Sequence, residues 1–281
     1  MLSRGQSGNR LASAVRALRA GRPTATDHSC DPELVALVTA PYTDSEAVHR
    51  RLAELLAAFE ARDDRRAVFL AIYSRMTAAV GRRIRRGEFA DSAWVESYLV
   101  AFANRYRLAV LHYERGRHSA LPDPWQIAFQ DAAAGDSLVL QDAMLGVNAH
   151  INYDLSLALH EVGVGPDHER RYADHSAIID IIADLVDKAQ VTLAERDADG
   201  LATLDDSLGR ADEWLTVAAI DQCRDSAWRT AVAMDSRLRL RRRLARWLNH
   251  TTATGAAYAI RSSRSSSHVH DALVTVEGST E

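Results

Sequence analysis

Apolar residues recur at helical spacing through almost the whole stretch from residue 31 to residue 261, and this pattern restricts the fold more than any other feature. Segments such as residues 47–64 and 176–190 place Leu, Ala, Val or Ile every three to four positions among charged residues, which is typical of amphipathic helices. The chain shows no alternation of apolar and polar residues that would predict a strand, and no internal repeat. The sequence therefore predicts an all-α fold.

Turn signals divide this stretch into helices of ordinary length. Gly87 and Gly116 are typical of helix ends, and Pro122 with Pro124 is typical of an irregular connector. We expect a single multi-helix bundle of about seven or eight helices over residues 31–261.

The two ends of the chain differ from this region in composition. Residues 1–30 contain five arginines and no acidic residue before Asp27. We expect a disordered basic tail there, with a weak amphipathic helix as the alternative because Leu11, Val15 and Leu18 have helical spacing. Residues 262–281 are polar and rich in Ser, which predicts a second disordered tail.

Composition excludes several classes of function. The net charge of −4 over 281 residues gives no general reason to expect binding to nucleic acid. The two cysteines, Cys30 and Cys223, lie far apart and predict neither a disulfide framework nor a zinc site. No apolar run approaches the roughly 20 residues of a transmembrane helix, and the N-terminus lacks the apolar core of a secretory signal. We expect a cytoplasmic protein, and the sequence leaves its oligomeric state open.

Residues 237–250 form the most basic segment of the chain. Their sequence, RLRLRRRLARWLNH, places Leu240, Leu244, Trp247 and Leu248 on one stripe with arginines around it. A bundle helix with a solvated basic face fits this pattern, and contact with anionic lipid or RNA is the alternative.

The helix expected over residues 136–161 carries polar residues where an apolar face would be usual. On a helical wheel, Gln141, Asn148 and Asn152 form one amide stripe, and His150 lies beside Asp154 on a second. The arc that would carry charge on a surface helix holds mostly small residues, so we expect a central, largely buried helix. Buried polar groups need partners, so these residues either form a structural network or line a polar pocket.

The following helix, expected over residues 168–190, has a solvated acidic face formed by Asp180, Asp184 and Asp187. Arg171, Asp174 and His175 fall on its apolar side. We expect this helix to run antiparallel to the 136–161 helix, with His175 facing His150 or Asp154. One alternative is a divalent metal held by these two histidines, Asp154 and Asp174, although no compact motif enforces it.

A later helix contributes Arg224 and Trp228, one turn apart on its buried side. We expect Arg224 either to stack on Trp228 or to pair with a buried carboxylate such as Asp154. Anion binding is the functional alternative.

The segment NAHINYDLSLAL (148–159) resembles the hallmark NAHINxDLPLAL helix of an uncharacterised prokaryotic family of unknown function. The similarity extends through FANRYRLAV (102–110) and the connector around Trp125 and, more weakly, through IDQCRDSAW (220–228). Ser156 stands where the family has Pro, and this difference leaves the polar positions unchanged. The resemblance implies an all-helical domain and carries no activity with it.

The sequence contains no P-loop, HExxH, GxSxG or paired ExxH motif, and nothing in it indicates a particular cofactor. The leading hypothesis is a non-redox enzyme of hydrolase, lyase or cyclase type that acts on a small, largely apolar metabolite. His150, oriented by Asp154, would be its general acid or base. Its substrate contacts would come from Asn148, Asn152, Gln141, Arg171, His175, Arg224 and Trp228. The alternatives are a non-catalytic ligand-binding or structural protein, and a metal-dependent enzyme using His150, Asp154 and His175.

Overall fold

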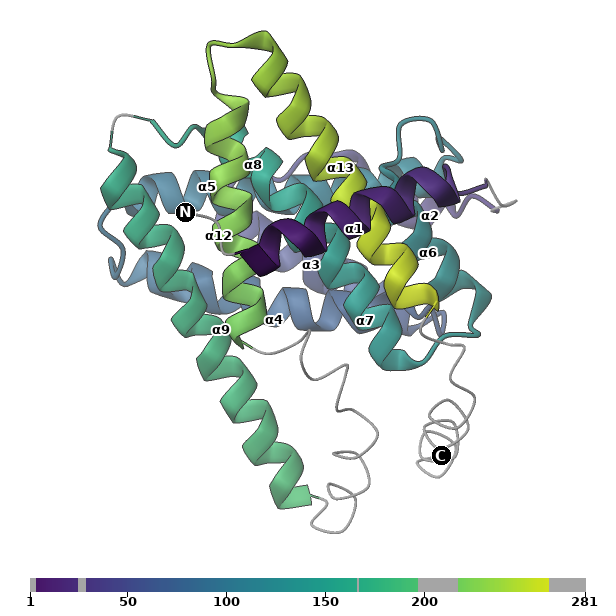
Figure 1. Ribbon diagram of the computed structural model, residues 1–281. Coiled ribbons are helices and arrows are strands. Elements are labelled where there is room, and N and C mark those ends of the chain that lie inside the picture. Colours follow the sequence, from purple (N-terminus) through teal and green to yellow (C-terminus); the bar gives the residue numbers. More distant parts are fainter. Residues whose placement is uncertain (1–3, 25–28, 166, 197–216, 263–281) are drawn as a thin grey trace.

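The structure, a computed structural model, describes residues 4–24, 29–165, 167–196 and 217–262 (Figure 1). Within these residues it contains ten helices and no strand, if the continuous helix over residues 139–162 is counted once. The all-α prediction is confirmed, and the expected seven or eight helices become ten. None of the described helices combines the length and the apolarity that a bilayer-crossing helix requires.

The described helices are numbered in chain order. Their bounds are α1 (Arg4–Ala20), α2 (Pro32–Thr39), α3 (Ser45–Glu60), α4 (Arg66–Arg85), α5 (Ser92–Glu114), α6 (Asp123–Ala134), α7 (Val139–Val147), η1 (Asn148–Asp154), α8 (Leu155–Val162), α9 (His168–Arg196), α12 (Val217–Met234) and α13 (Arg239–Ser262).

Two of the helices that the sequence analysis did not separate have a proline in their first turn. Asp31 caps α2 by accepting hydrogen bonds from two backbone N–H groups, and Pro32 follows it in the first turn. In α6, Pro124 also lies in the first turn. Proline is favoured there because its missing N–H has no partner within a helix. The prolines that predicted an irregular connector thus start α6.

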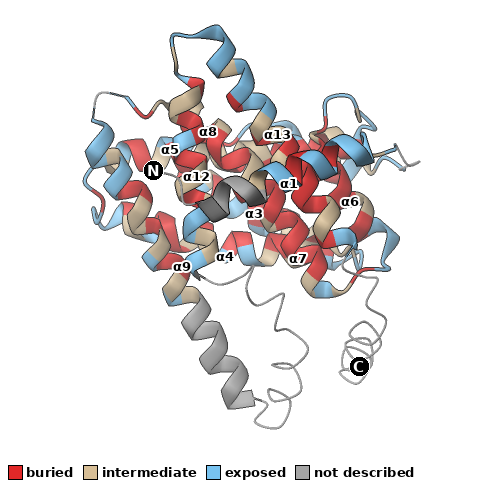
Figure 2. Ribbon diagram, viewed as in Figure 1, coloured by how far each residue is buried: buried red, intermediate tan, exposed pale blue. Residues whose placement is uncertain are grey.

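The helix formed by α7, η1 and α8 runs through the middle of the molecule (Figure 1). Its central part, η1, contacts α5, α6, α12 and α13, and most of α7 is buried (Figure 2). The helix therefore has the central, buried position that the small residues of the sequence predicted. By contrast, α9 packs mainly on α12, α4 and α5 rather than antiparallel to this helix. The break at Gly163 and Gly165, both at positive φ, allows the chain to turn away.

The N-terminal segment differs from the expected disordered tail. Residues 4–20 form α1, which lies across α13 (Figure 1). Ala14 and Ala17 are buried against the body, and Arg16 Nη1 donates to the carbonyl of Gly255 at 3.4 Å. Small residues on the inner side of α1 allow this close approach, so the amphipathic alternative describes residues 4–20 better. From residue 263 onward, the expected Ser-rich tail lies outside the described residues.

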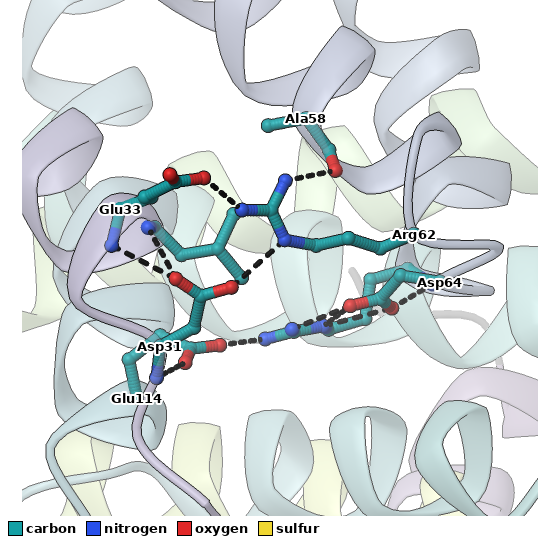
Figure 3. Close-up of polar contacts among 8 residues, drawn as sticks. Asp31, Glu33, Ala58, Arg62, Asp64 and Glu114 are labelled. Carbon is teal, nitrogen blue, oxygen red and sulfur yellow. Dashed lines mark hydrogen bonds and ion pairs between the residues drawn. The ribbon is translucent and has the colours of Figure 1, made fainter.

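An ion-pair network that is buried at Arg66 and Glu114 joins α2, α4 and α5 (Figure 3). Arg66 Nη1 donates to the fully buried Glu114 at 2.6 Å and its guanidinium also contacts Asp64. The backbone N–H of Asp31 donates to the same Glu114 carboxylate, and Arg62 Nε donates to Asp31 Oδ2 at 2.8 Å. Since a buried carboxylate is costly without partners, this network restricts how these three helices can pack.

The contact between α1 and α13 predicts a strong effect of Gly255→Ala. A Cβ at this position would overlap the backbone carbonyl of Ser13, which cannot move without displacing α1. We expect a loss of about 1–3 kcal/mol in the free energy of unfolding and faster amide hydrogen exchange in α1.

Gly81→Ala is the matched control. Its Cβ would meet only the end of the Arg85 side chain, at 3.6 Å. This change should leave stability unchanged or raise it by up to about 1 kcal/mol. Equal urea midpoints and equal α1 exchange for the two variants would contradict the proposed close contact.

Candidate functional site

The polar segment NAHINYD (148–154) forms a π-helical stretch, η1, within an otherwise α-helical rod. The backbone N–H of Leu155 donates to the carbonyl of His150, five residues earlier. Such insertions widen the turn and are frequent at functional sites. The helical wheel assumes about 100° of rotation per residue. It therefore could not show the wider turn of the π-helical backbone at these residues.

His150 and Asp154 form the pair that their spacing predicted, with Trp125 as a third member. His150 Nδ1 lies 3.1 Å from Asp154 Oδ2, and Trp125 Nε1 donates to the same oxygen at 2.7 Å. Their exposed fractions are 1% for His150 and Trp125 and 2% for Asp154. The pair is therefore sealed from solvent and held together by α6 and η1.

Aromatic rings enclose the His150 imidazole on several sides, and we call this set the aromatic box: Phe69, Tyr73, Phe102, Tyr106 and Trp125. Phe102 stacks on the imidazole with a centroid separation of 3.6 Å and an interplanar angle of 8°. Tyr73 approaches edge to face at 4.4 Å. The box brings together α4, α5 and α6 around η1.

This environment sets the protonation state of His150. Burial lowers the pKa of the imidazole, and the hydrogen bond with Asp154 opposes that effect only in part. The ring is thus neutral at neutral pH, with Nδ1–H donating to the carboxylate and Nε2 left as an acceptor. Nε2 is buried and has no hydrogen-bond partner among the described residues.

The amide stripe faces a different neighbourhood. Asn152 Nδ2 donates to Asn148 Oδ1 at 2.9 Å, and Asn148 Nδ2 donates to the carbonyl of Ala253 in α13 at 3.0 Å. Beside them lies a narrow cleft between η1, α7, α12 and α13, which we call the amide cleft. It is lined by Asn148 and Asn152 together with Met144, Val147, Ile151, Ile220, Cys223 and Ile260.

The amide cleft has a volume of about 20 Å³, enough for little more than one water molecule. Burial raises the pKa of the Cys223 thiol to about 11, so this cysteine is protonated and unreactive at neutral pH. Asn152 is only half-buried, which means that the amide stripe reaches the protein surface here. The cleft is thus mainly apolar, with two amides and a neutral thiol.

His175 and Arg224 form a separate polar cluster, between α9 and α12. His175 Nε2 lies 3.3 Å from the Arg224 carbonyl, its Nδ1 lies 3.3 Å from Tyr98 Oη, and Arg224 Nη2 donates to the His175 carbonyl at 2.7 Å. Burial and the nearby guanidinium hold the pKa of His175 well below its usual value. The ring of Trp228 packs against His175 and covers one side of this cluster.

The residues named as metal ligands therefore lie in different places. His150 and Asp154 are together, His175 belongs to the second cluster, and Asp174 accepts hydrogen bonds from the backbone of Ala90 and Asp91 at 2.8 and 2.7 Å. In the part of the chain that the structure describes, no three His, Cys, Asp or Glu side chains are grouped as metal ligands would be. The predicted approach of His175 to His150 is wrong because α9 packs on α12.

The other predicted substrate contacts have local partners. Arg224 contacts His175 instead of Asp154. Gln141 Nε2 donates to the Ile260 carbonyl at 3.2 Å and fixes the start of α7 against α13. Arg171 donates to the carbonyl of Gly163 at 3.3 Å, at the α8–α9 connection. None of these three side chains reaches His150 or Asp154 in the structure.

Sequence reasoning did not place Phe69, Tyr73, Phe102 or Trp125 around His150, although the spacing on α5 carried a signal. Phe102 and Tyr106 are four residues apart on α5, so they share one face. Trp125 also gave a signal, because a buried indole N–H needs an acceptor and Asp154 is one. The sequence could not show that these faces meet at η1.

The family model described as "Family of unknown function (DUF5995)" matches residues 45–263. No curated protein and no solved structure matches the chain.

Removing the Asp154 carboxylate tests the sealed pair. Asp154→Ala leaves the indole N–H of Trp125 and Nδ1 of His150 without their acceptor, so we expect a loss of about 2–4 kcal/mol in the free energy of unfolding. Asp154→Asn, which keeps an oxygen for Trp125, should cost less. The exposed Asp180→Ala should stay within about 0.5 kcal/mol of wild type, and equal urea midpoints for Asp154→Ala and Asp180→Ala would refute the pair's structural role.

The low pKa of His175 predicts a pH-dependent stability. The folded protein keeps this imidazole neutral, whereas the unfolded chain takes up a proton below about pH 6.5. Acid therefore favours the unfolded state, and the free energy of unfolding falls as the pH drops from about 6.5 toward the native pKa. His175→Gln should have a flatter profile in urea titrations between about pH 7.5 and 5.5, and a slope equal to that of wild type would contradict this.

Proposed function

The chain belongs to the DUF5995 family of unknown function, and we propose that it is a non-catalytic protein that binds a small, largely apolar molecule in the amide cleft. The observation that carries the proposal is the division of η1 into two sides. His150 and Asp154 are enclosed by aromatic rings, whereas Asn152 is half-buried beside an apolar cleft. A ligand can approach the second side from the protein surface at Asn152 without opening the aromatic box.

The chemistry of the amide cleft defines the kind of ligand. Most of its lining is aliphatic, and its polar groups are the amides of Asn148 and Asn152 and a thiol that is neutral at physiological pH. No charged side chain is among the lining residues, and the Arg10 guanidinium acts on the Cys223 thiol from outside this lining, so the lining itself favours an uncharged ligand group. An uncharged molecule with an apolar body and one hydroxyl, carbonyl or amide group fits this lining.

The cleft is narrow, so binding requires movement of its walls. The flexible side chain of Met144 and the half-buried residues Ile220 and Cys223 of α12 are the parts that can move apart. A thin, unbranched ligand needs the smallest displacement. Its binding should therefore be accompanied by ordering or a small shift of α12.

Enzyme catalysis by His150 is a second candidate, and one observation favours it. Asp154 holds the imidazole as a neutral base, and Nε2 is buried without a partner in the part of the chain that the structure describes. Such an atom costs free energy that a hydrogen bond from a substrate would recover. A substrate would meet Nε2 only if the aromatic box opened. General acid–base chemistry of hydrolase or lyase type is the reaction class that such a histidine serves.

The binding proposal is tested by titrating the protein with 1-decanol in a calorimeter. We expect wild type to bind it, and Asn152→Leu and Cys223→Phe to weaken binding by about tenfold or more, because they remove a hydrogen-bonding group or fill the cleft. Ile72→Phe, a change at an exposed position of α4, is the matched control and should bind like wild type.

The same variants distinguish the two candidates. Equal decanol binding by wild type and Cys223→Phe, or no binding by wild type, would contradict a ligand site in the cleft. Turnover of p-nitrophenyl esters by wild type that is lost in His150→Gln and retained in Asn152→Leu would instead favour the enzyme.

A further inference from the structure

The turn between α12 and α13 and the first half of α13 project from the body of the molecule (Figure 1). This projection, which we call the basic tip (residues 237–247), is largely exposed (Figure 2). Its large apolar side chains are exposed as well, with fractions of 68% for Leu238, 78% for Leu240, 50% for Leu244 and 44% for Trp247. These four side chains lie within ten positions, and their exposure shows that they contribute little to the packing of the bundle.

Arginines surround this apolar stripe. The basic tip contains Arg237, Arg239, Arg241, Arg242, Arg243 and Arg246 and no acidic residue, in a chain whose net charge is −4. Arg239, Arg242, Arg243 and Arg246 line one hollow of about 390 Å³. They follow helical spacing, so their guanidinium groups lie along one side of the stripe formed by Leu240, Leu244 and Trp247.

Among the described residues, no arginine of the tip forms an ion pair with a carboxylate, although Arg246 contacts α8. In the described part of the chain, Arg242 donates to the carbonyl of Ser236 at 2.9 Å, and Arg246 Nη2 lies 3.1 Å from His160 Nε2. These partners are neutral or weakly basic groups rather than carboxylates. The positive charge of the tip therefore remains available to an anionic partner.

We propose that the basic tip docks on an anionic lipid membrane surface. Leu240, Leu244 and Trp247 would enter the boundary between headgroups and acyl chains, and lipid phosphates would occupy the hollow lined by the arginines. An RNA or an acidic peptide would satisfy the arginines but would leave the aliphatic side chains in water. The bilayer surface is the partner that complements both the apolar stripe and the arginines beside it.

The proposal is tested by vesicle flotation with the full chain. We expect binding to vesicles of phosphatidylcholine with about 30% phosphatidylglycerol, little binding to pure phosphatidylcholine, and loss of binding at high salt. We expect the fourfold variant Arg239→Gln, Arg242→Gln, Arg243→Gln, Arg246→Gln to have an affinity for these vesicles at least about tenfold lower than that of wild type. The double variant Leu240→Ser, Leu244→Ser should also lose binding, although its charge is unchanged.

A control with the same net charge separates this site from general electrostatics. Arg75, Arg82, Arg85 and Arg86 are exposed positions of α4 and its C-terminal end, and replacing all four by Gln should leave vesicle binding intact. Circular dichroism melts check that each variant is folded. The proposal would be overturned if wild type did not bind vesicles, or if the two fourfold variants lost binding equally. It would also be overturned if the protein bound a single-stranded RNA but not vesicles, or if vesicle binding were lost only after Leu11→Ser and Leu18→Ser in α1.

Discussion

The carboxylate of Asp154 is the group on which the centre of this structure depends. It lies in the core with two neutral donors, the indole of Trp125 and the imidazole of His150, at 2.7 and 3.1 Å. A buried carboxylate is tolerated only when such donors are held in place. The donors in turn fix the position of α6 against η1, and the rings that pack on His150 extend the constraint to α4 and α5.

The π-helical turn allows one short segment to serve two environments. On one side it presents His150 and Asp154 to a closed aromatic box, and on the other it presents Asn148 and Asn152 to α13 and a surface cleft. The sealed side has the arrangement of a structural pair, because its members are almost fully buried. The open side is where we place the ligand, and this assignment rests on access and lining chemistry rather than on family membership.

Much of this architecture could be predicted from local patterns. Helical periodicity gave the fold class, and the small residues around VNAHINYDL gave the central position of that helix. The His150–Asp154 pair followed from a four-residue spacing. The prediction that His175 joins this pair was wrong, because the packing of α9 on α12 depends on the turn at Gly163 and Gly165. The start of α6 was missed because Pro122 and Pro124 were interpreted as an irregular connector, although proline is favoured in the first turn of a helix.

The most direct test of the sealed pair is nitrogen NMR of His150 in protein labelled at histidine, with His150→Gln to assign the signals. The structure predicts a ring with its proton on Nδ1 that is more than half neutral at about pH 6.5, where a free imidazole is half protonated, because burial lowers its pKa. It also predicts a Trp125 indole N–H that exchanges with solvent only when the protein unfolds. A His150 signal that titrates like a free imidazole, or rapid exchange of that indole in the folded protein, would contradict a closed aromatic box.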